Sequence, residues 1–115
     1  MVVLSRLGSA SGKDLTDPIS IVSVDYSDVA ALAVTFEEHK IDVVISTIGM
    51  QALSLQTGIG DAAKQAGVKL FLPSEFGANT IGVTDGILSP KHYFAEHLKS
   101  IGLPSARIFV STRQL

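Results

Sequence analysis

Two kinds of hydrophobic pattern alternate along the chain, and together they predict alternating strands and helices. Short continuous runs of Val, Ile and Leu indicate strands that are buried on both faces. These runs lie at residues 2–6, 19–24, 41–46, 68–72 and 105–110. Continuous apolar strands separated by helical stretches are typical of a parallel sheet, so we expect the five strands to run in one direction.

Apolar residues at helical spacing predict helices between these strands. The first helix is expected to begin after an N-cap at Ser27 and to run to His39. The second is expected to carry Leu53 and Leu55 together with later apolar positions. It should end at Gly67, because glycine commonly terminates helices.

A third helix is expected after a loop at residues 78–88. Ser89 and Pro90 mark its start, because proline is favoured at the first helical position, and Gly102 marks its end. The order of elements predicts a single α/β domain over residues 1–115. Its parallel sheet should be doubly wound, with helices on both faces.

The composition excludes several classes of function. The 115 residues have a net charge of −2 and only 17% are charged, so we expect no direct nucleic-acid partner. The chain contains no cysteine, which excludes disulfides and thiolate chemistry. Its three histidines, His39, His92 and His97, lack the spacing of metal ligands, so no metal site is expected.

The hydrophobic runs are also too short for a membrane protein. None approaches the roughly 20 apolar residues of a spanning helix. No secretory signal precedes the first strand, and we therefore expect a cytoplasmic protein that does not enter membranes.

Polar residues cluster where the expected strands end. In open α/β sheets, ligands bind just beyond the carboxyl ends of parallel strands. Each of these residues alone also fits an ordinary turn or helix cap, but together they outline one rim. They are Asp25, Ser46, Thr47, Gly49, Ser74 and Glu75.

Two basic residues are candidates for a role at this rim. Arg6 ends the first strand, where dinucleotide-binding folds place an arginine that accommodates the 2′-phosphate of NADP. Lys91 shares a helical stripe with Phe94 and Leu98, which directs it toward the sheet. A helix N-terminus and partial burial disfavour its charge, as suits a general acid or base. A solvated Arg6 and a Lys91 whose amine reaches solvent are the alternatives.

A G-x-G-x-x-A sequence at residues 58–63 is not expected to bind a nucleotide. This motif works only where it follows a strand and opens a helix, so that backbone N–H groups face a pyrophosphate. Here it falls inside the second expected helix, and we predict a structural role.

With these residues in view, the chain resembles the NmrA-like and isoflavone-reductase-like family of atypical short-chain dehydrogenase folds. The resemblance covers nearly the whole chain. Its most specific segment runs from Leu70 through Pro73-Ser74-Glu75-Phe76-Gly77, with Lys91 placed ahead of Gly102-Leu103-Pro104.

The resemblance implies an NADP-binding Rossmann-like domain that transfers hydride from NADPH to a small organic, phenylpropanoid-type substrate. It implies that Arg6 lies at the 2′-phosphate and that Lys91 assists hydride transfer, eleven positions before Gly102. In a second branch of the family, the same fold senses NADP without turnover. The remaining residues that the resemblance places beside the cofactor are Thr47, Ile48, Gly49, Ser74, Glu75 and Phe76.

The chain departs from the family pattern at its start, where the family has a first strand and a glycine-rich turn. We therefore expect an incomplete sheet, because the missing strand is the central one in the order 3-2-1-4-5-6. Its neighbours must pair with each other, leave exposed edges that promote self-association, or borrow a strand from another chain. We expect the chain by itself to bind NADPH weakly or not at all, and an inert truncated fragment is the third alternative.

Overall fold

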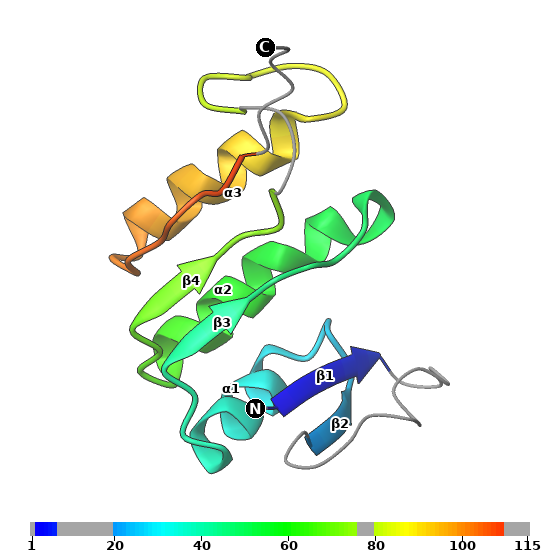
Figure 1. The fold of residues 1–115 in the computed structure, drawn as a ribbon, viewed down its shortest axis with the longest axis vertical. Coiled ribbons are helices and arrows are strands. Elements are labelled where there is room, and N and C mark those ends of the chain that lie inside the picture. The colour runs from blue at the N-terminus through cyan, green and yellow to red at the C-terminus, as the bar shows by residue number, and fades with distance from the viewer. Residues whose placement is uncertain (1, 7–19, 76–79, 110–115) are drawn as a thin grey trace, which may run out of the picture.

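The fold consists of parallel strand pairs and a layer of helices (Figure 1). A computed structural model of the protein describes residues 2–6, 20–75 and 80–109. The elements in chain order are β1 (Val2–Arg6), β2 (Ser20–Val24), α1 (Val29–Glu38), β3 (Val43–Ile45), the 3₁₀ helix η1 (Met50–Leu55), α2 (Gln56–Gln65), β4 (Leu70–Leu72) and α3 (Ser89–Ser100).

The strands form two separate parallel pairs. β1 pairs with β2 from Val2 opposite Ser20, and β3 pairs with β4 from Val43 opposite Leu70. Within the described residues, no strand pairing joins β1 to β3. The predicted α/β fold with parallel strands is therefore confirmed, and its sheet is divided where the order 3-2-1-4-5-6 places its first strand.

The prediction of a strand at residues 105–110 is wrong for residues 105–109, the part that the structure describes. Ser105 alone forms a parallel bridge with Phe71, and the Ala106 N–H donates to the Phe71 carbonyl at 3.2 Å. The ladder stops there because β4 is followed by Pro73, which has no N–H to donate. Val110 lies outside the described residues.

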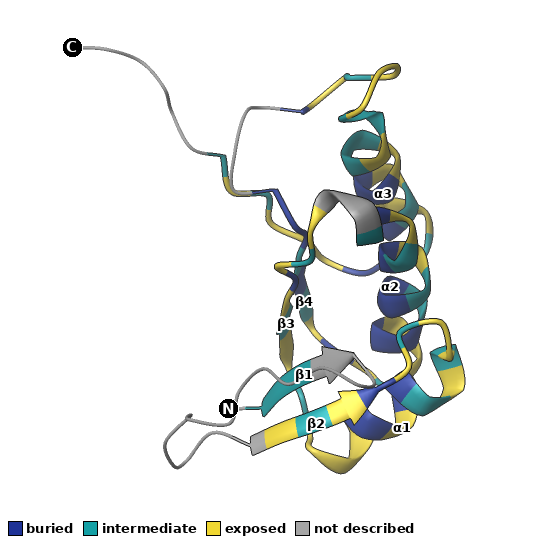
Figure 2. Cartoon of the chain, turned by 90° about the vertical axis from the view of Figure 1, so that its right-hand side faces the viewer, coloured by how far each residue is buried: buried dark blue, intermediate teal, exposed yellow. Residues whose placement is uncertain are grey.

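The helices lie on one side of the strands, whereas both faces were expected to be covered. Figure 2 shows α1, α2 and α3 in one layer beside the strands. Apolar side chains of the strands are consequently exposed among the described residues, with Val43 47% and Ile45 61% accessible. In the described part of the chain, helices therefore cover one face of the strands.

The first helix begins one residue later than predicted. Asp28 rather than Ser27 is its N-cap, because the Asp28 side chain accepts from the Ala31 N–H at 3.0 Å. The Ser27 hydroxyl instead donates to Asp25 Oδ1 at 2.6 Å.

The second predicted helix is two elements in the structure. Its first turns form η1, in which the Ala52 N–H donates to the Gly49 carbonyl three residues back, and α2 follows. A pattern spanning one or two turns does not distinguish three residues per turn from 3.6, so the sequence did not separate them. The third helix ends at Ser100, and Gly102 has a positive φ of 72° just beyond it.

The core lies between the strands and the helix layer. Phe71 of β4 is fully buried and meets Phe94 of α3 edge to face, with ring centroids 5.4 Å apart. Leu32 of α1 and Leu98 of α3 are also fully buried. This core fixes β4 against α3, which determines where the ends of β3 and β4 meet the start of α3. None of the helices in the described ranges is long and apolar enough to cross a membrane.

Candidate functional site

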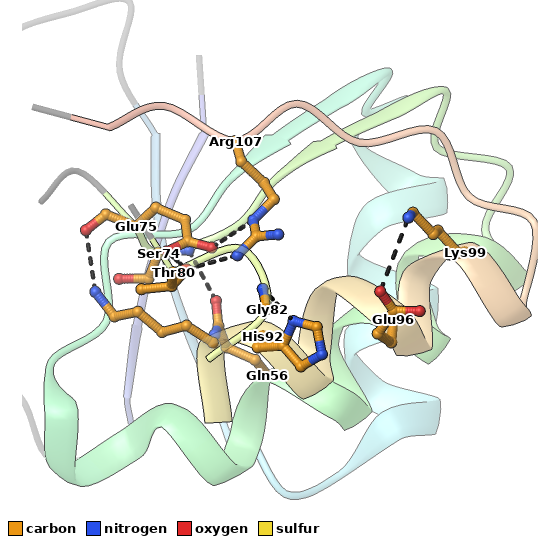
Figure 3. Close-up of polar contacts among 10 residues, drawn as sticks. Gln56, Ser74, Glu75, Thr80, Gly82, His92, Glu96, Lys99 and Arg107 are labelled. Carbon is orange, nitrogen blue, oxygen red and sulfur yellow. Dashed lines mark hydrogen bonds and ion pairs between the residues drawn. The ribbon is translucent and has the colours of Figure 1, made fainter. Parts of the chain in front are cut away.

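The carboxyl ends of β3 and β4 are joined by the backbone and side chain of Ser74. The Ser74 hydroxyl donates to the Ile48 carbonyl at 2.7 Å. The Ser74 N–H donates to Gln56 Oε1 at 3.0 Å (Figure 3). Ser74 and Gln56 are both buried. These bonds connect the residues after β4, the residues after β3 and the first turn of α2. We call this meeting point of Ile48, Gln56 and Ser74 the junction. The structure therefore brings together Ile48 and Ser74, two of the residues that the resemblance places beside a cofactor.

Glu75 carries a fully buried carboxylate directly beside this junction. Its Oε2 accepts from the Arg107 Nε–H at 2.8 Å, and its Oε1 accepts from the Thr80 hydroxyl at 2.8 Å. Arg107 also donates from Nη2 to the Thr80 hydroxyl (Figure 3). The Glu75 side chain is 0% exposed and that of Arg107 15% exposed. Glu75 thus serves as an internal ion-pair partner, and its carboxylate is turned away from solvent.

Lys91 reaches the same junction from the first turn of α3. Its ammonium group donates to the backbone carbonyl of Glu75 at 3.1 Å. Lys91 is half-buried, while Phe94 and Leu98 on the same helical stripe are buried against the core. An ammonium group has three N–H donors, so this bond leaves others for a ligand.

Two buried polar atoms near the junction have no hydrogen-bond partner within the described part of the chain. They are the hydroxyl of Ser46, which follows β3, and Nε2 of Gln56. Buried polar groups in proteins are nearly always hydrogen-bonded, so each of these atoms calls for a partner such as a water, an ion or a ligand. With Lys91, they give this rim three groups that can donate hydrogen bonds.

The other predicted residues are less closely associated with the junction. Thr47 and Gly49 are exposed beside Ile48. Arg6 ends β1 in register with Val24, and the position of its side chain is not among the described features. Phe76 lies outside the described residues.

Asp25, which was also expected at the rim, forms a local turn. Its carboxylate accepts from the hydroxyl and the N–H of Ser27 at 2.6 and 2.9 Å, and these bonds lower the pKa of Asp25. Asp25 is therefore an ordinary turn residue, which was the alternative considered for each rim position.

Sequence reasoning missed three residues of the junction: Gln56, Thr80 and Arg107. Gln56 is 1% exposed although it lies on an amphipathic helix, and a polar residue at an apolar position is the signal that could have found it. Thr80 and Arg107 lie in segments without regular structure. Only the tertiary fold brings them close to Glu75, so no sequence pattern indicated these contacts.

Two other expectations concern phosphate and metal binding. The G-x-G-x-x-A sequence lies within α2, as predicted, so its N–H groups belong to helical turns. A Cβ on Gly60 would lie 3.1 Å from side-chain atoms of Leu98 and Phe94, so this glycine permits close helix packing. Among the described residues, no group of three His, Asp or Glu side chains could hold a metal ion.

Two plant proteins are similar to this chain in sequence. "Isoflavone reductase homolog P3" of Arabidopsis thaliana is 41% identical over 86 residues, covering 74% of this chain. "Phenylcoumaran benzylic ether reductase IRL1" of Ginkgo biloba is 39% identical over 82 residues, covering 70% of this chain. The aligned region is 26% of the length of each relative, so the chain spans about a quarter of either protein.

Solved structures agree with this relationship. The binary complex of leucoanthocyanidin reductase with NADPH from Vitis vinifera matches 94% of this chain and 40% of that chain, with a TM-score of 0.78. At 24% identity, this likeness establishes the fold. AtPrR2 with NADP+ and (+)pinoresinol matches 79% of this chain and 32% of that chain, with a TM-score of 0.69 and 25% identity.

The model of the NmrA-like family matches residues 12–113, which is most of the chain. This match agrees with the isoflavone-reductase-type relatives and with the Rossmann-like fold. The chain therefore belongs to the NmrA-like family.

Proposed function

We propose that the chain forms part of an NADPH-dependent reductase that transfers hydride to a small organic substrate of phenylpropanoid type. The observation that carries this proposal is the position of Lys91, whose ammonium group is held at the ends of β3 and β4 by the Glu75 carbonyl. Ligands of open α/β sheets bind at this edge. The NADPH and NADP+ complexes among the structural neighbours support the choice of cofactor.

In this proposal, Lys91 moves a proton at the reacting heteroatom of the substrate. NADPH, when bound, supplies the hydride that reduces a neighbouring carbon. As the new carbon–hydrogen bond forms, the bond between that carbon and its ether oxygen breaks, and the Nζ group of Lys91 donates a proton to the oxygen that gains negative charge. The Glu75 carbonyl keeps the Lys91 side chain at the rim. Arg6 would pair with the 2′-phosphate, because its planar fork matches a phosphate group.

The residues beside the cofactor are also part of the proposal. Thr47, Ile48 and Gly49 follow β3, and Ser74 follows β4, so all four lie where a nicotinamide would meet the rim. The unpartnered Ser46 hydroxyl and Gln56 Nε2 support a polar ligand here, because a bound molecule would satisfy them.

The test is the oxidation of NADPH by the 115-residue chain with (+)-pinoresinol as substrate. Cofactor binding is measured first, by fluorescence titration. It is expected to be weaker than micromolar, because none of the described helices opens on a glycine-rich turn. Slow oxidation is expected at high NADPH concentration. Lys91→Met should lower the rate constant by about a hundredfold or more, without changing the NADPH dissociation constant.

Lys91→Arg is the matched control, since it keeps the charge but is a poor proton donor near neutral pH. A rate close to that of the wild type in either variant would refute the catalytic role of Lys91. NADPH binding without any oxidation would instead favour a non-enzymatic NADP sensor.

A further inference from the structure

Residues 80–88, which we call the strap, directly precede α3 on the surface of the molecule (Figure 1). Most of the strap is exposed, but its first residue, Thr80, is only 1% exposed. The Thr80 hydroxyl donates to Glu75 Oε1 at 2.8 Å. The last residue, Leu88, is the N-cap of α3. The strap therefore runs from the buried Glu75 carboxylate to the helix that carries Lys91.

Three hydrogen bonds hold the strap against the first turns of α3. Each joins a backbone group of the strap to a side chain of the helix. The pairs are the Gly82 N–H with His92 Nδ1 at 3.1 Å, the Thr84 carbonyl with the Tyr93 hydroxyl at 2.9 Å, and the Gly86 carbonyl with the Ser89 hydroxyl at 2.8 Å. Both hydroxyl donors keep their protons between pH 5 and 8. Of these three bonds, the one at Gly82 alone depends on the ionisation of its partner.

His92 accepts the Gly82 N–H only as a neutral imidazole. The acceptor is the lone pair of Nδ1, so the ring hydrogen of the neutral form lies on Nε2 (Figure 3). Both nitrogens of a protonated imidazole are donors. Histidine gains its proton between pH 8 and pH 5 unless its surroundings prevent it. Acidification therefore removes this bond and turns an Nδ1–H toward the Gly82 N–H.

The charged groups around His92 leave room for a positive charge on the ring. The titratable side chains of the two segments that meet at this ring are Lys91, Tyr93 and Glu96 of α3 and Asp85 of the strap. η1, which packs against α3, carries no titratable side chain. Carboxylates of the neighbouring elements are already engaged, Asp61 by His97 and Glu75 by Arg107. Two carboxylates and one ammonium group thus surround a half-buried imidazole, so charge repulsion does not keep the proton away.

We propose that the strap is a pH-sensitive device, which neutral His92 holds against α3 and which protonation of His92 releases. The two hydroxyl bonds keep the second half of the strap on the helix, so residues 80–83 are the part that moves. Their release takes the Thr80 hydroxyl away from the buried Glu75 carboxylate. Acidification thereby opens the side of the rim next to Lys91.

Amide hydrogen exchange of the 115-residue chain, measured by NMR at pH 8 and pH 5 and divided by the intrinsic rate at each pH, tests this proposal. The Gly82 N–H should be about fivefold or more less protected at pH 5, as expected for the loss of one hydrogen bond. The Val83 N–H, which donates to the Thr80 carbonyl at 3.1 Å, should lose protection with it. The Phe71 N–H in the core should stay protected. These readouts require neither NADPH nor turnover, so they are independent of the proposed reaction.

Two variants assign the effect to His92. His92→Asn supplies an amide oxygen, which accepts an N–H and does not titrate, so protection of Gly82 should be the same at both pH values. His92→Phe keeps an aromatic ring without an acceptor, so protection should be low at both. Asn and Phe have helix propensities close to that of His, and α3 should form in either variant. His39→Asn, at the exposed end of α1, is the matched control and should keep the pH dependence of the wild type.

Three results would each overturn the proposal. The first is equal protection of Gly82 at pH 8 and pH 5 in the wild type, and the second is a pH dependence that persists in His92→Asn. The third is a parallel loss of protection at Phe71, which would mean that acid unfolds the whole chain rather than the strap.

Discussion

The contact between Glu75 and Arg107 determines how the rim is built, because it fixes the backbone that holds Lys91. The Glu75 carboxylate accepts from Arg107 and Thr80, while the carbonyl of the same residue accepts from Lys91. Residues 32 apart in sequence are thereby tied together at a buried position. Arg107 therefore acts on the site through Glu75.

Removing the arginine should be costly. Arg107→Met leaves the 0% exposed Glu75 carboxylate without its cation, and we expect unfolding free energy to fall by about 3 to 5 kcal/mol. The double variant Glu75→Gln with Arg107→Met removes the buried charge as well, so it should be destabilised much less than Arg107→Met alone. Urea denaturation of the single and double variants measures both effects.

The chain provides its own control for this prediction. Lys99 and Glu96 form an ion pair at 3.8 Å on the outside of α3, with side chains 76% and 52% exposed (Figure 3). Lys99→Met should cost no more than about 0.5 kcal/mol, because exposed pairs are screened by solvent. Comparable losses for Arg107→Met and Lys99→Met would mean that burial does not strengthen the inner pair.

At the level of elements, the two glycines of α2 illustrate the difference between a motif and its context. Gly58 lies beside Val29 of α1, and Gly60 lies beside Leu98 and Phe94 of α3. Both positions let helices approach closely. The sequence predicted the structural role because residues 58–63 fall within a helix, but the neighbours that each glycine meets depend on the fold.

These two positions should respond differently to alanine. Gly60→Ala places a methyl group 3.1 Å from buried atoms of Leu98 and Phe94, and overpacking there should cost about 1 to 3 kcal/mol. The gain in helix propensity, about 1 kcal/mol, offsets only part of this. In Gly58→Ala, the single close atom belongs to the half-buried Val29, so the two effects should nearly cancel.

Urea denaturation of the two variants measures this contrast within a single helix. A Gly60→Ala variant more stable than the wild type would indicate that α2 and α3 separate without cost. The packing interpretation of the motif would then be wrong.

The sequence predicted the secondary-structure elements better than the contacts between them. Continuous apolar runs predicted the parallel strands, because burial on both faces leaves no polar alternation. The prediction of a strand beyond Ser105 was wrong because Pro73, which follows β4, has no N–H to donate to the next bond of the ladder. The bonds of Gln56 and Arg107 were missed for a similar reason, since their partners are brought close only by the tertiary fold.

At the scale of the whole molecule, β4 and β2 differ in how closely they are bound to the rest of the chain. Phe71 in β4 is 0% exposed, and its N–H donates to the Pro104 carbonyl at 2.9 Å. Ile21 in β2 is 38% exposed, and among the described residues β2 pairs with β1 alone. Local opening follows such differences in burial and pairing.

We therefore expect β1 and β2 to open more readily than β4 and the helix layer. Native-state hydrogen exchange, corrected for intrinsic rates, should give ladder amides of β2 opening free energies below that of the Phe71 amide. Tyr26→Phe should accelerate exchange in β1 and β2 further, because it removes the 2.9 Å bond to Leu4. Tyr93→Phe removes an exposed hydroxyl bond to Thr84 and should leave these amides unchanged. Equal opening free energies in β2 and β4 would mean that the two strand pairs unfold as one cooperative unit, although no strand pairing joins them within the described residues.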